Sequence, residues 1–149
     1  MSPCAQAAAF RLTLLTTEPL WVRAAAVAGV QRVGVDIERR GKRARQRSWS
    51  DARISDHRLA QLRAVAAHAG GARVFARLNP LHAGTATEVE RALALGASSL
   101  MLPQFRTPAH AERFVGLVAG RAEVLLLVET EPAVARLREI AAVRGVDEI

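Results

Sequence analysis

The chain has 149 residues, about the length of one globular domain, with 50% hydrophobic residues, 23% charged residues and a formal net charge of +7. No apolar run approaches the roughly 18 residues of a membrane span, and the N-terminus lacks the basic region and apolar core of a secretion signal. The single cysteine, Cys4, excludes an internal disulfide and a cysteine-based zinc site. We therefore predict a cytoplasmic globular protein that has no membrane contact.

The positive charge comes almost wholly from arginine, since Lys42 is the only lysine. This bias is more typical of the codon usage of a GC-rich genome than of selection for polyanion binding. The segment 39-RRGKRARQR-47 is denser in charge than the rest of the chain. Three interpretations stay open: a solvated loop, an anchor for the phosphates of a CoA thioester or another anion through Arg43, Arg45 and Arg47, or a nucleic-acid contact. No aromatic residues are interleaved with these arginines, so we do not expect nucleic acid to be the partner.

Five apolar runs typical of strands alternate with helical patterns at a period near 25 residues. The predicted strands cover 11–16, 32–37, 73–78, 98–102 and 123–128, and the predicted helices cover 18–28, 56–69, 86–95, 107–119 and 131–142. Repeated βα units of this kind predict a parallel sheet, either doubly wound or closed as a (β/α)8 barrel.

Capping signals support these helix boundaries. Thr107 before Pro108 is typical of an N-cap followed by proline at the first helical position, and Gly70 and Gly96 stand where helices should end. The stretch 38–55 has no convincing periodicity and is longer than the usual βα loop. Such loops lie at the carboxyl edge of a parallel sheet, where both architectures keep their active sites.

The period of two along each strand brings three charged side chains to one edge. Helix-facing positions alternate along strands two, three and five, which leaves Glu38, Arg77 and Glu129 on the opposite face at the carboxyl ends. A doubly wound sheet has helices on both faces and offers no shared interior, so this convergence favours a barrel. The helix-facing residues are predicted to be Val33, Val35, Ile37, Val74, Ala76, Leu78, Val124, Leu126 and Val128.

These three side chains suit the binding of an anionic substrate. An arginine fork binds a carboxylate through two parallel hydrogen bonds, and a glutamate at a strand end is a hard oxygen ligand for Mg²⁺ or Mn²⁺. A metal ion together with an arginine could hold a 2-oxo acid and stabilise its enolate during carbon–carbon cleavage. The alternative is that Glu129 and Arg77 form an internal ion pair that only rigidifies the sheet.

Four motifs in register resemble the HpcH/HpaI aldolase and citrate lyase β-subunit family: 33-VGVDIE-38, 74-VFARLNP-80, 100-LMLPQ-104 and 125-LLLVET-130. The resemblance runs from about Phe10 to Ile149 and covers five βα units. It implies a (β/α)8 barrel related to phosphoenolpyruvate-binding enzymes. It also implies that Arg77 holds the substrate carboxylate, that Glu129 binds Mg²⁺ or Mn²⁺, and that Glu38 lies beside the reacting centre.

The chain departs from the family pattern after strand two, where Arg39 and Arg40 stand in place of the histidine or second aspartate of other members. Lys42 lies among arginines, which argues against a Schiff-base mechanism. Gln104 and His82 are candidate substrate contacts at the same rim, and His57 is a candidate to line the long loop. The general base stays open between Glu38, His82 and a metal-bound water.

The sequence thus predicts a single partial barrel domain over 1–149, truncated near a sixth strand that begins at Val146, without the second metal carboxylate implied by the resemblance. We predict a divalent-metal-dependent lyase acting on a 2-oxo acid or acyl-CoA; the alternative is a non-catalytic anion- or partner-binding module that uses the 39–47 loop. An open sheet edge and an interior lined by Phe75, Leu125, Leu127 and Leu14 predict that the chain alone is an oligomer, is prone to aggregate or is part of a larger protein, and we favour a homo-oligomer.

Overall fold

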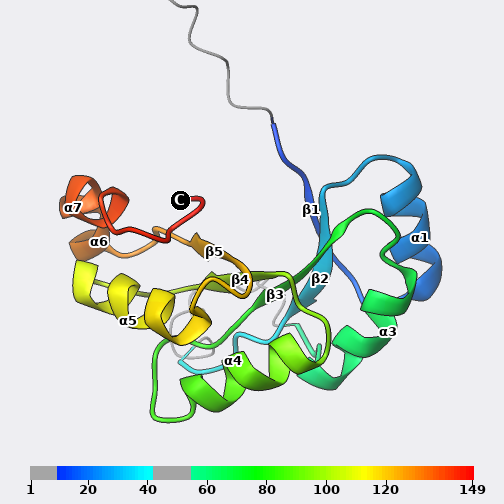
Figure 1. Cartoon of the computed structure of the whole chain (residues 1–149), viewed down its shortest axis with the longest axis horizontal. Helices are drawn as coiled ribbons and strands as arrows, with labels where there is room; N and C mark the ends of the chain where they lie inside the picture. Colours follow the sequence, from blue (N-terminus) through cyan, green and yellow to red (C-terminus); the bar gives the residue numbers. More distant parts are fainter. Residues whose placement is uncertain (1–9, 42–54) are drawn as a thin grey trace, which may run out of the picture.

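A five-stranded parallel sheet forms the centre of the computed structural model, which describes residues 10–41 and 55–149. Its strands follow one another across the sheet in the order of the sequence (Figure 1). They are β1 (Thr13–Leu15), β2 (Arg32–Asp36), β3 (Arg73–Arg77), β4 (Ser99–Leu102) and β5 (Glu123–Leu126). Each lies within a predicted strand, so the five βα units are confirmed.

The helices form an arc around one face of this sheet (Figure 1). Sequential strand order with right-handed crossovers places every connection on the same side, whereas a doubly wound sheet reverses its order part-way. The fold is therefore of the (β/α)8 type in incomplete form. The helical elements are α1 (Pro19–Val27), the 3-10 turn η1 (Leu59–Gln61), α3 (Leu62–His68), α4 (Thr85–Ala94), α5 (Pro108–Val118), α6 (Glu131–Ala135) and α7 (Leu137–Ala141).

The helix ends follow their capping residues. The Thr107 side chain accepts a hydrogen bond from the His110 N–H, as predicted, and Thr130 caps α6 in the same way through Ala133. Gly70 and Gly96 adopt the positive φ angles expected after a helix. The single helix predicted over 131–142 is wrong, because Arg136 leaves the helical region at φ −112° and ψ 20° and divides it into α6 and α7.

The alternation of faces along the strands is confirmed in the core. The helix-facing residues of β2 and β3 pack with the helices in one hydrophobic cluster, together with Val124, Leu126 and Val128. The assignment of Leu14 to the sheet interior is wrong. Leu14 pairs with Val33 and packs in the helix-side cluster, whereas Leu15 pairs with Gly34 on the opposite face. The residues of the short β1 strand were therefore assigned one position out of phase.

Two of the apolar side chains on the interior face are more buried than the sequence predicted. Phe75 and Leu125 are each only 2% exposed. The large apolar side chains that do reach solvent lie near β1, on α1, on α6 and α7 and at the carboxyl end, and of these Leu15 belongs to the interior face. Those side chains are Phe10, Leu12, Leu15, Leu20, Trp21, Val27, Val134, Leu137 and Ile149.

This distribution of apolar surface predicts self-association. The strand β1 lies at an edge of the sheet, and Leu20 and Trp21 on the neighbouring α1 are 74% and 66% exposed. Open edges and clustered apolar side chains favour pairing with another chain. Sizing chromatography with light scattering should give a mass above that of the monomer, and a Leu20→Glu, Trp21→Glu variant should reduce it. A monomeric wild-type chain at every concentration would contradict this prediction.

A buried ion network occupies the amino ends of the strands on the interior face. Arg32 is 2% exposed and donates from Nε and Nη2 to the two oxygens of Glu123, at 3.0 and 2.9 Å, and from Nη1 to Glu148 at 3.1 Å. Ser99 Oγ donates to Glu123 at 2.8 Å, and Arg11, which lies just before β1, donates to Glu123 at 3.0 Å. The network ties the segment before β1 and the strands β2, β4 and β5 to the last residues of the chain.

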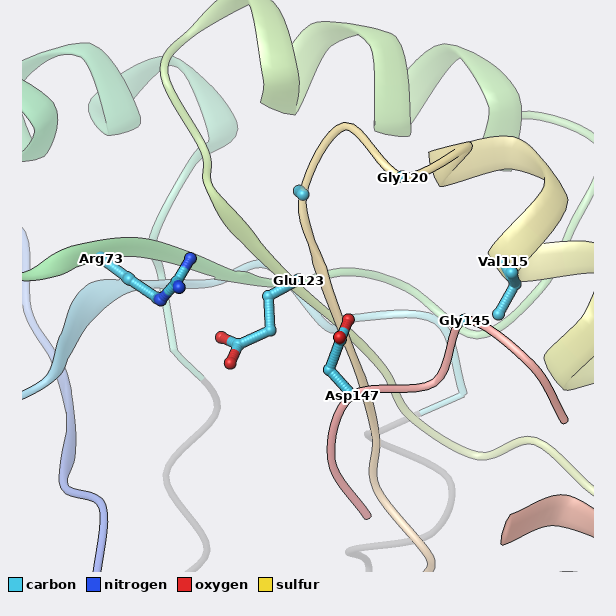
Figure 2. A pocket seen from close by; sticks show the side chains of 7 residues that line it. Arg73, Val115, Gly120, Glu123, Gly145 and Asp147 are labelled. Carbon is cyan, nitrogen blue, oxygen red and sulfur yellow. The ribbon is translucent and has the colours of Figure 1, made fainter. Parts of the chain in front are cut away.

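Residues 146–149 lie beside β5. The Asp147 N–H donates to the Val124 carbonyl, the Leu126 N–H donates to the Glu148 carbonyl, and Leu125 pairs with Glu148 in the parallel sense. A sixth strand near Val146 is therefore confirmed only as an isolated bridge. A pocket of about 320 Å³ next to this segment is lined by Arg73, Glu123 and Asp147, whose side chains Figure 2 shows, but it lies at the amino ends of the strands. Among the residues described, no helix has the length and apolarity to cross a bilayer.

Candidate functional site

The carboxyl ends of β2 and β3 bring Asp36 and Arg77 together at the opposite rim. These two residues are register partners in neighbouring strands. Arg77 Nε donates to Asp36 Oδ1 at 2.9 Å, and Nη2 pairs with Asp36 Oδ2. Glu38 follows at the same rim, with its Oε2 3.7 Å from Arg77 Nε. The predicted convergence of Glu38 and Arg77 is present, and Asp36 is a member that the sequence analysis did not single out.

The electrostatics of this cluster fix the charge of Arg77. The hydrogen bonds to Asp36 raise the pKa of the guanidinium, burial opposes this, and the charges of Asp36, Glu38 and Glu129 add to the increase. Asp36 and Glu38 are each 3% exposed, whereas 22% of the Arg77 side chain reaches solvent. Arg77 is therefore a permanent cation, oriented from behind by buried carboxylates.

The guanidinium keeps one edge for a ligand. Its Nε–Nη2 edge faces Asp36, and no hydrogen bond from Nη1 is found within the described part of the chain. The remaining Nη1–Nη2 edge has the fork geometry that binds a carboxylate through two parallel hydrogen bonds. Asp36 thus acts as the residue that orients the fork.

Glu129 lies at this rim but differs from its expected setting. It is exposed, and its Oε1 accepts the Gln104 N–H at 3.1 Å. The ion pairs of Arg77 are with Asp36 and Glu38, so the alternative of a direct Glu129–Arg77 ion pair is wrong. The strand ends at Leu126, three residues before Glu129, which explains why the carboxylate reaches solvent.

His82 is turned into the loop between β3 and α4. Its Nδ1 accepts the Gly84 N–H at 2.9 Å. Its Nε2 is buried and lies 3.1 Å from Glu88 Oε1, yet the direction does not make a hydrogen bond, so the contact is a close approach that would become an ion pair if the ring were protonated. The ring is thus engaged with its own loop, which weakens the case for His82 as a substrate contact.

Asn79 connects this loop to the start of the basic segment. Its Oδ1 accepts the N–H groups of Arg39 and Arg40 at 3.0 and 3.1 Å, and its Nδ2 donates to Glu88 at 2.8 Å. His57 approaches from the other side, where its Nδ1 accepts the Asp36 N–H at 3.2 Å. Of these two residues, the sequence analysis singled out only His57, as a candidate to line the long loop, and the hydrogen bonds of both are seen only in the folded chain.

The remaining candidates for anion contact, Arg43, Arg45 and Arg47, lie outside the described residues. Their proposed role in binding phosphates therefore stays a prediction.

A divalent metal ion would find an incomplete set of ligands. Glu129 is a hard oxygen donor of the type that Mg²⁺ takes. Within 10–41 and 55–149, however, no group of three histidine, cysteine, aspartate or glutamate side chains could hold a metal ion. The other carboxylates of this rim, Asp36 and Glu38, form ion pairs with Arg77. The described residues alone therefore do not form a metal site.

This incomplete ligand set gives a measurable expectation. The 149-residue chain should bind Mg²⁺ only weakly, with a dissociation constant above the millimolar range, because one exposed carboxylate must compete with water for the ion. Isothermal titration of Mg²⁺ and Mn²⁺ against the wild-type chain and Glu129→Gln measures this. Micromolar affinity that survives Glu129→Gln would mean that other residues hold the ion.

Solved structures with the same fold are similar over most of this chain. An HpcH/HpaI aldolase from Desulfitobacterium hafniense DCB-2 matches 91% of the chain and 58% of its own length, with 20% identity and a TM-score of 0.66. An HpcH/HpaI aldolase/citrate lyase family protein from Burkholderia cenocepacia J2315 matches 91% of the chain and 60% of its own length, with 25% identity and a TM-score of 0.64. The citrate synthase SbnG matches 93% of the chain and 59% of its own length, with 19% identity and a TM-score of 0.64. The chain thus spans less than two thirds of the length of these structures.

No curated protein matches the sequence. The sequence profile of the HpcH/HpaI aldolase/citrate lyase family matches residues 12–149, which is most of the chain. This match includes β1 to β5 and the rim that carries Asp36, Arg77 and Glu129. The chain belongs to the HpcH/HpaI aldolase/citrate lyase family.

Proposed function

We propose that this chain contributes the carboxylate-binding half of a carbon–carbon lyase that acts on a 2-oxo acid or an acyl-CoA. One observation carries the proposal: Asp36 binds the Nε–Nη2 edge of the Arg77 guanidinium, and 22% of the Arg77 side chain reaches solvent. Family membership supports an aldolase- or citrate-lyase-like fold. Because the chain spans only part of the related structures, the activity of the whole protein is itself part of the proposal.

The residues of the rim take distinct roles in this proposal. Arg77 binds the substrate carboxylate, and Glu38 lies next to it as a candidate general base. Gln104 is a contact for the polar group beside the carboxylate, with His82 as a weaker candidate. Glu129 contributes one ligand to Mg²⁺ or Mn²⁺, on which members of this family generally depend, and the other ligands come from groups outside the described residues. We further propose a cytoplasmic homo-oligomer.

Enzyme assays on a version of the protein in which the barrel is complete test this function. A panel of 2-hydroxy and 2-oxo acids and acyl-CoA thioesters should include at least one that is cleaved in the presence of Mg²⁺ or Mn²⁺. Absence of turnover across the panel, together with a melting temperature unchanged by either ion, would overturn the proposal.

The Arg77→Lys variant should bind carboxylates more weakly, by about 1–3 kcal/mol, although the positive charge is kept. Lysine presents a point charge, so it cannot make two parallel hydrogen bonds to Asp36 and two more to a ligand carboxylate at the same time. Titration of pyruvate, followed by NMR, compares the variant with the wild type, and circular dichroism serves as the control for folding. Equal affinity in both proteins would show that the fork does not bind the ligand.

Three variants distinguish anion binding by the basic loop from carboxylate binding at the rim. If the basic loop is the functional element, Arg43→Ser, Arg45→Ser and Arg47→Ser together should abolish anion binding, while Glu129→Gln should leave it intact. If the rim is the functional element, the triple variant should keep pyruvate binding, and Arg77→Lys should weaken it. The same pyruvate titration reads out both cases.

A further inference from the structure

Gln104 adopts a backbone conformation that no helix ending accounts for. Its φ angle is 54°, and Ala119, with φ 51°, is the only other non-glycine residue with positive φ among the residues described. Ala119 caps the carboxyl end of α5, where a left-handed residue is common. Gln104 follows β4, between a strand and the next helix. A left-handed side-chain-bearing residue there is costly, and such strain is concentrated at functional sites.

Neighbouring residues hold Gln104 in this conformation from two sides. Its N–H donates to Glu129 Oε1 at 3.1 Å, and the Thr130 hydroxyl donates to the Phe105 carbonyl at 2.7 Å. Phe105 itself is 2% exposed and packs in the core. The turn after β4 is therefore fixed to the turn after β5 by two hydrogen bonds and one buried ring. The surrounding structure thus determines the strained conformation.

The same arrangement leaves two polar groups at the rim without a hydrogen bond inside the described residues. One is the carboxamide of Gln104, whose side chain is half-buried, and the other is the second oxygen of Glu129. A carboxamide offers two donors and one acceptor, which suits an oxo or hydroxyl group beside a carboxylate. Arg77 is close enough for the charge of Glu129 to act on it.

We propose that Gln104 is a positioning and specificity-determining residue of this rim. Its backbone N–H fixes Oε1 of Glu129, which leaves Oε2 for a ligand, and its carboxamide binds the polar group next to the ligand carboxylate. The class of ligand rests on the proposed function, whereas the positioning of Glu129 does not.

Glycine substitution at the two left-handed residues tests the strain. Gln104→Gly and Ala119→Gly should each shift the unfolding equilibrium toward the folded state by about fivefold, because glycine adopts positive φ without a steric cost. Urea denaturation of both variants measures the shift. A Gln104→Gly variant less stable than the wild type, beside a stabilised Ala119→Gly, would overturn the proposal that the turn is held under strain.

Pyruvate titration by NMR then tests specificity. Gln104→Gly should lose about tenfold in affinity because the carboxamide is gone. Gln104→Asn should keep most of the affinity, since asparagine tolerates the left-handed region and retains the amide, and Ala119→Gly should equal the wild type. Unchanged affinity in Gln104→Gly would overturn the specificity role.

Hydrogen exchange at the Gln104 amide separates this inference from the proposed function. Glu129→Ala should speed exchange by about fivefold relative to Glu129→Gln, which retains an acceptor oxygen. Equal exchange in the two variants would overturn the positioning role. A wild-type chain that binds no pyruvate would overturn the proposed ligand class and the specificity role together, while the exchange result still decides the positioning role.

Discussion

Replacing Gly34 by alanine is expected to destabilise the chain by more than about 3 kcal/mol, beyond the usual cost of overpacking. Gly34 lies in the middle of β2, and all five residues of this strand are buried. A Cβ atom on Gly34 would lie 1.7 Å from the backbone carbonyl oxygen of Phe75 on β3. A backbone atom in a paired strand cannot move aside as a flexible side chain can, so β2 and β3 would have to separate at their centre.

Urea denaturation of Gly34→Ala should therefore show a large loss of stability or no cooperative transition. Gly116→Ala is the matched control, because Gly116 lies in α5 and an added Cβ there meets nothing within 4 Å. That control should gain about 0.5–1 kcal/mol, since alanine is the better helix former. Similar stability in the two variants would mean that the backbone of β3 leaves room for a Cβ atom on Gly34.

Replacing Arg32 by methionine is expected to cost about 3–5 kcal/mol, the usual effect of removing one partner from a buried ion pair. The substitution leaves the Glu123 and Glu148 carboxylates facing one another, with the half-exposed Arg11 as the remaining salt-bridge partner among the described residues and with Arg73 acting on Glu123 through its charge. Arg121→Met is the control, because its pair with Glu90 lies in solvent and should contribute little. Denaturation of the two variants at pH 7 compares them directly.

The Arg32–Glu123 pair also predicts that the pH dependence of stability is reversed in Arg32→Met. Burial alone would raise the pKa of Glu123, but hydrogen bonds from Arg32 and Ser99 outweigh it and lower the pKa below its ordinary 4.5. A carboxylate with a lowered pKa stabilises the fold above pH 4.5, and this contribution is lost as the pH falls through the folded-state pKa. In Arg32→Met the burial effect dominates, so acidification should instead recover stability. Parallel pH profiles in the two proteins would contradict the network.

The period of two within each strand was sufficient to predict much of the candidate site. It placed Glu38 and Arg77 on the interior face at the carboxyl ends, and the structure brings both to one rim. The same pattern contained the position of Asp36, which shares the face of Glu38, but one strand by itself does not reveal its neighbour. The partner of Arg77 depends on the register between β2 and β3, which pairs Asp36 with Arg77. The sequence analysis therefore assigned the wrong carboxylate to the ion-pair alternative.

What the sequence by itself determined is the set of five βα units, the barrel-type order, the faces of the longer strands and the family. These features depend on local periodicity, capping residues and short motifs, all of which are read from neighbouring residues. A short strand such as β1 carries too few residues for its phase to be read, and Leu14 was placed on the wrong face for that reason.

Only the tertiary structure decided the contacts between residues that are distant in the chain. The Arg32 network joins strands more than 90 residues apart, the Gly34 position is set by the Phe75 backbone, and the Gln104 turn is held by Glu129. Phe75 and Leu125 are buried although the pattern predicted an open interior. Each of these depends on strand register and on the packing of side chains across the sheet, and these long-range contacts leave no periodic signal in the sequence.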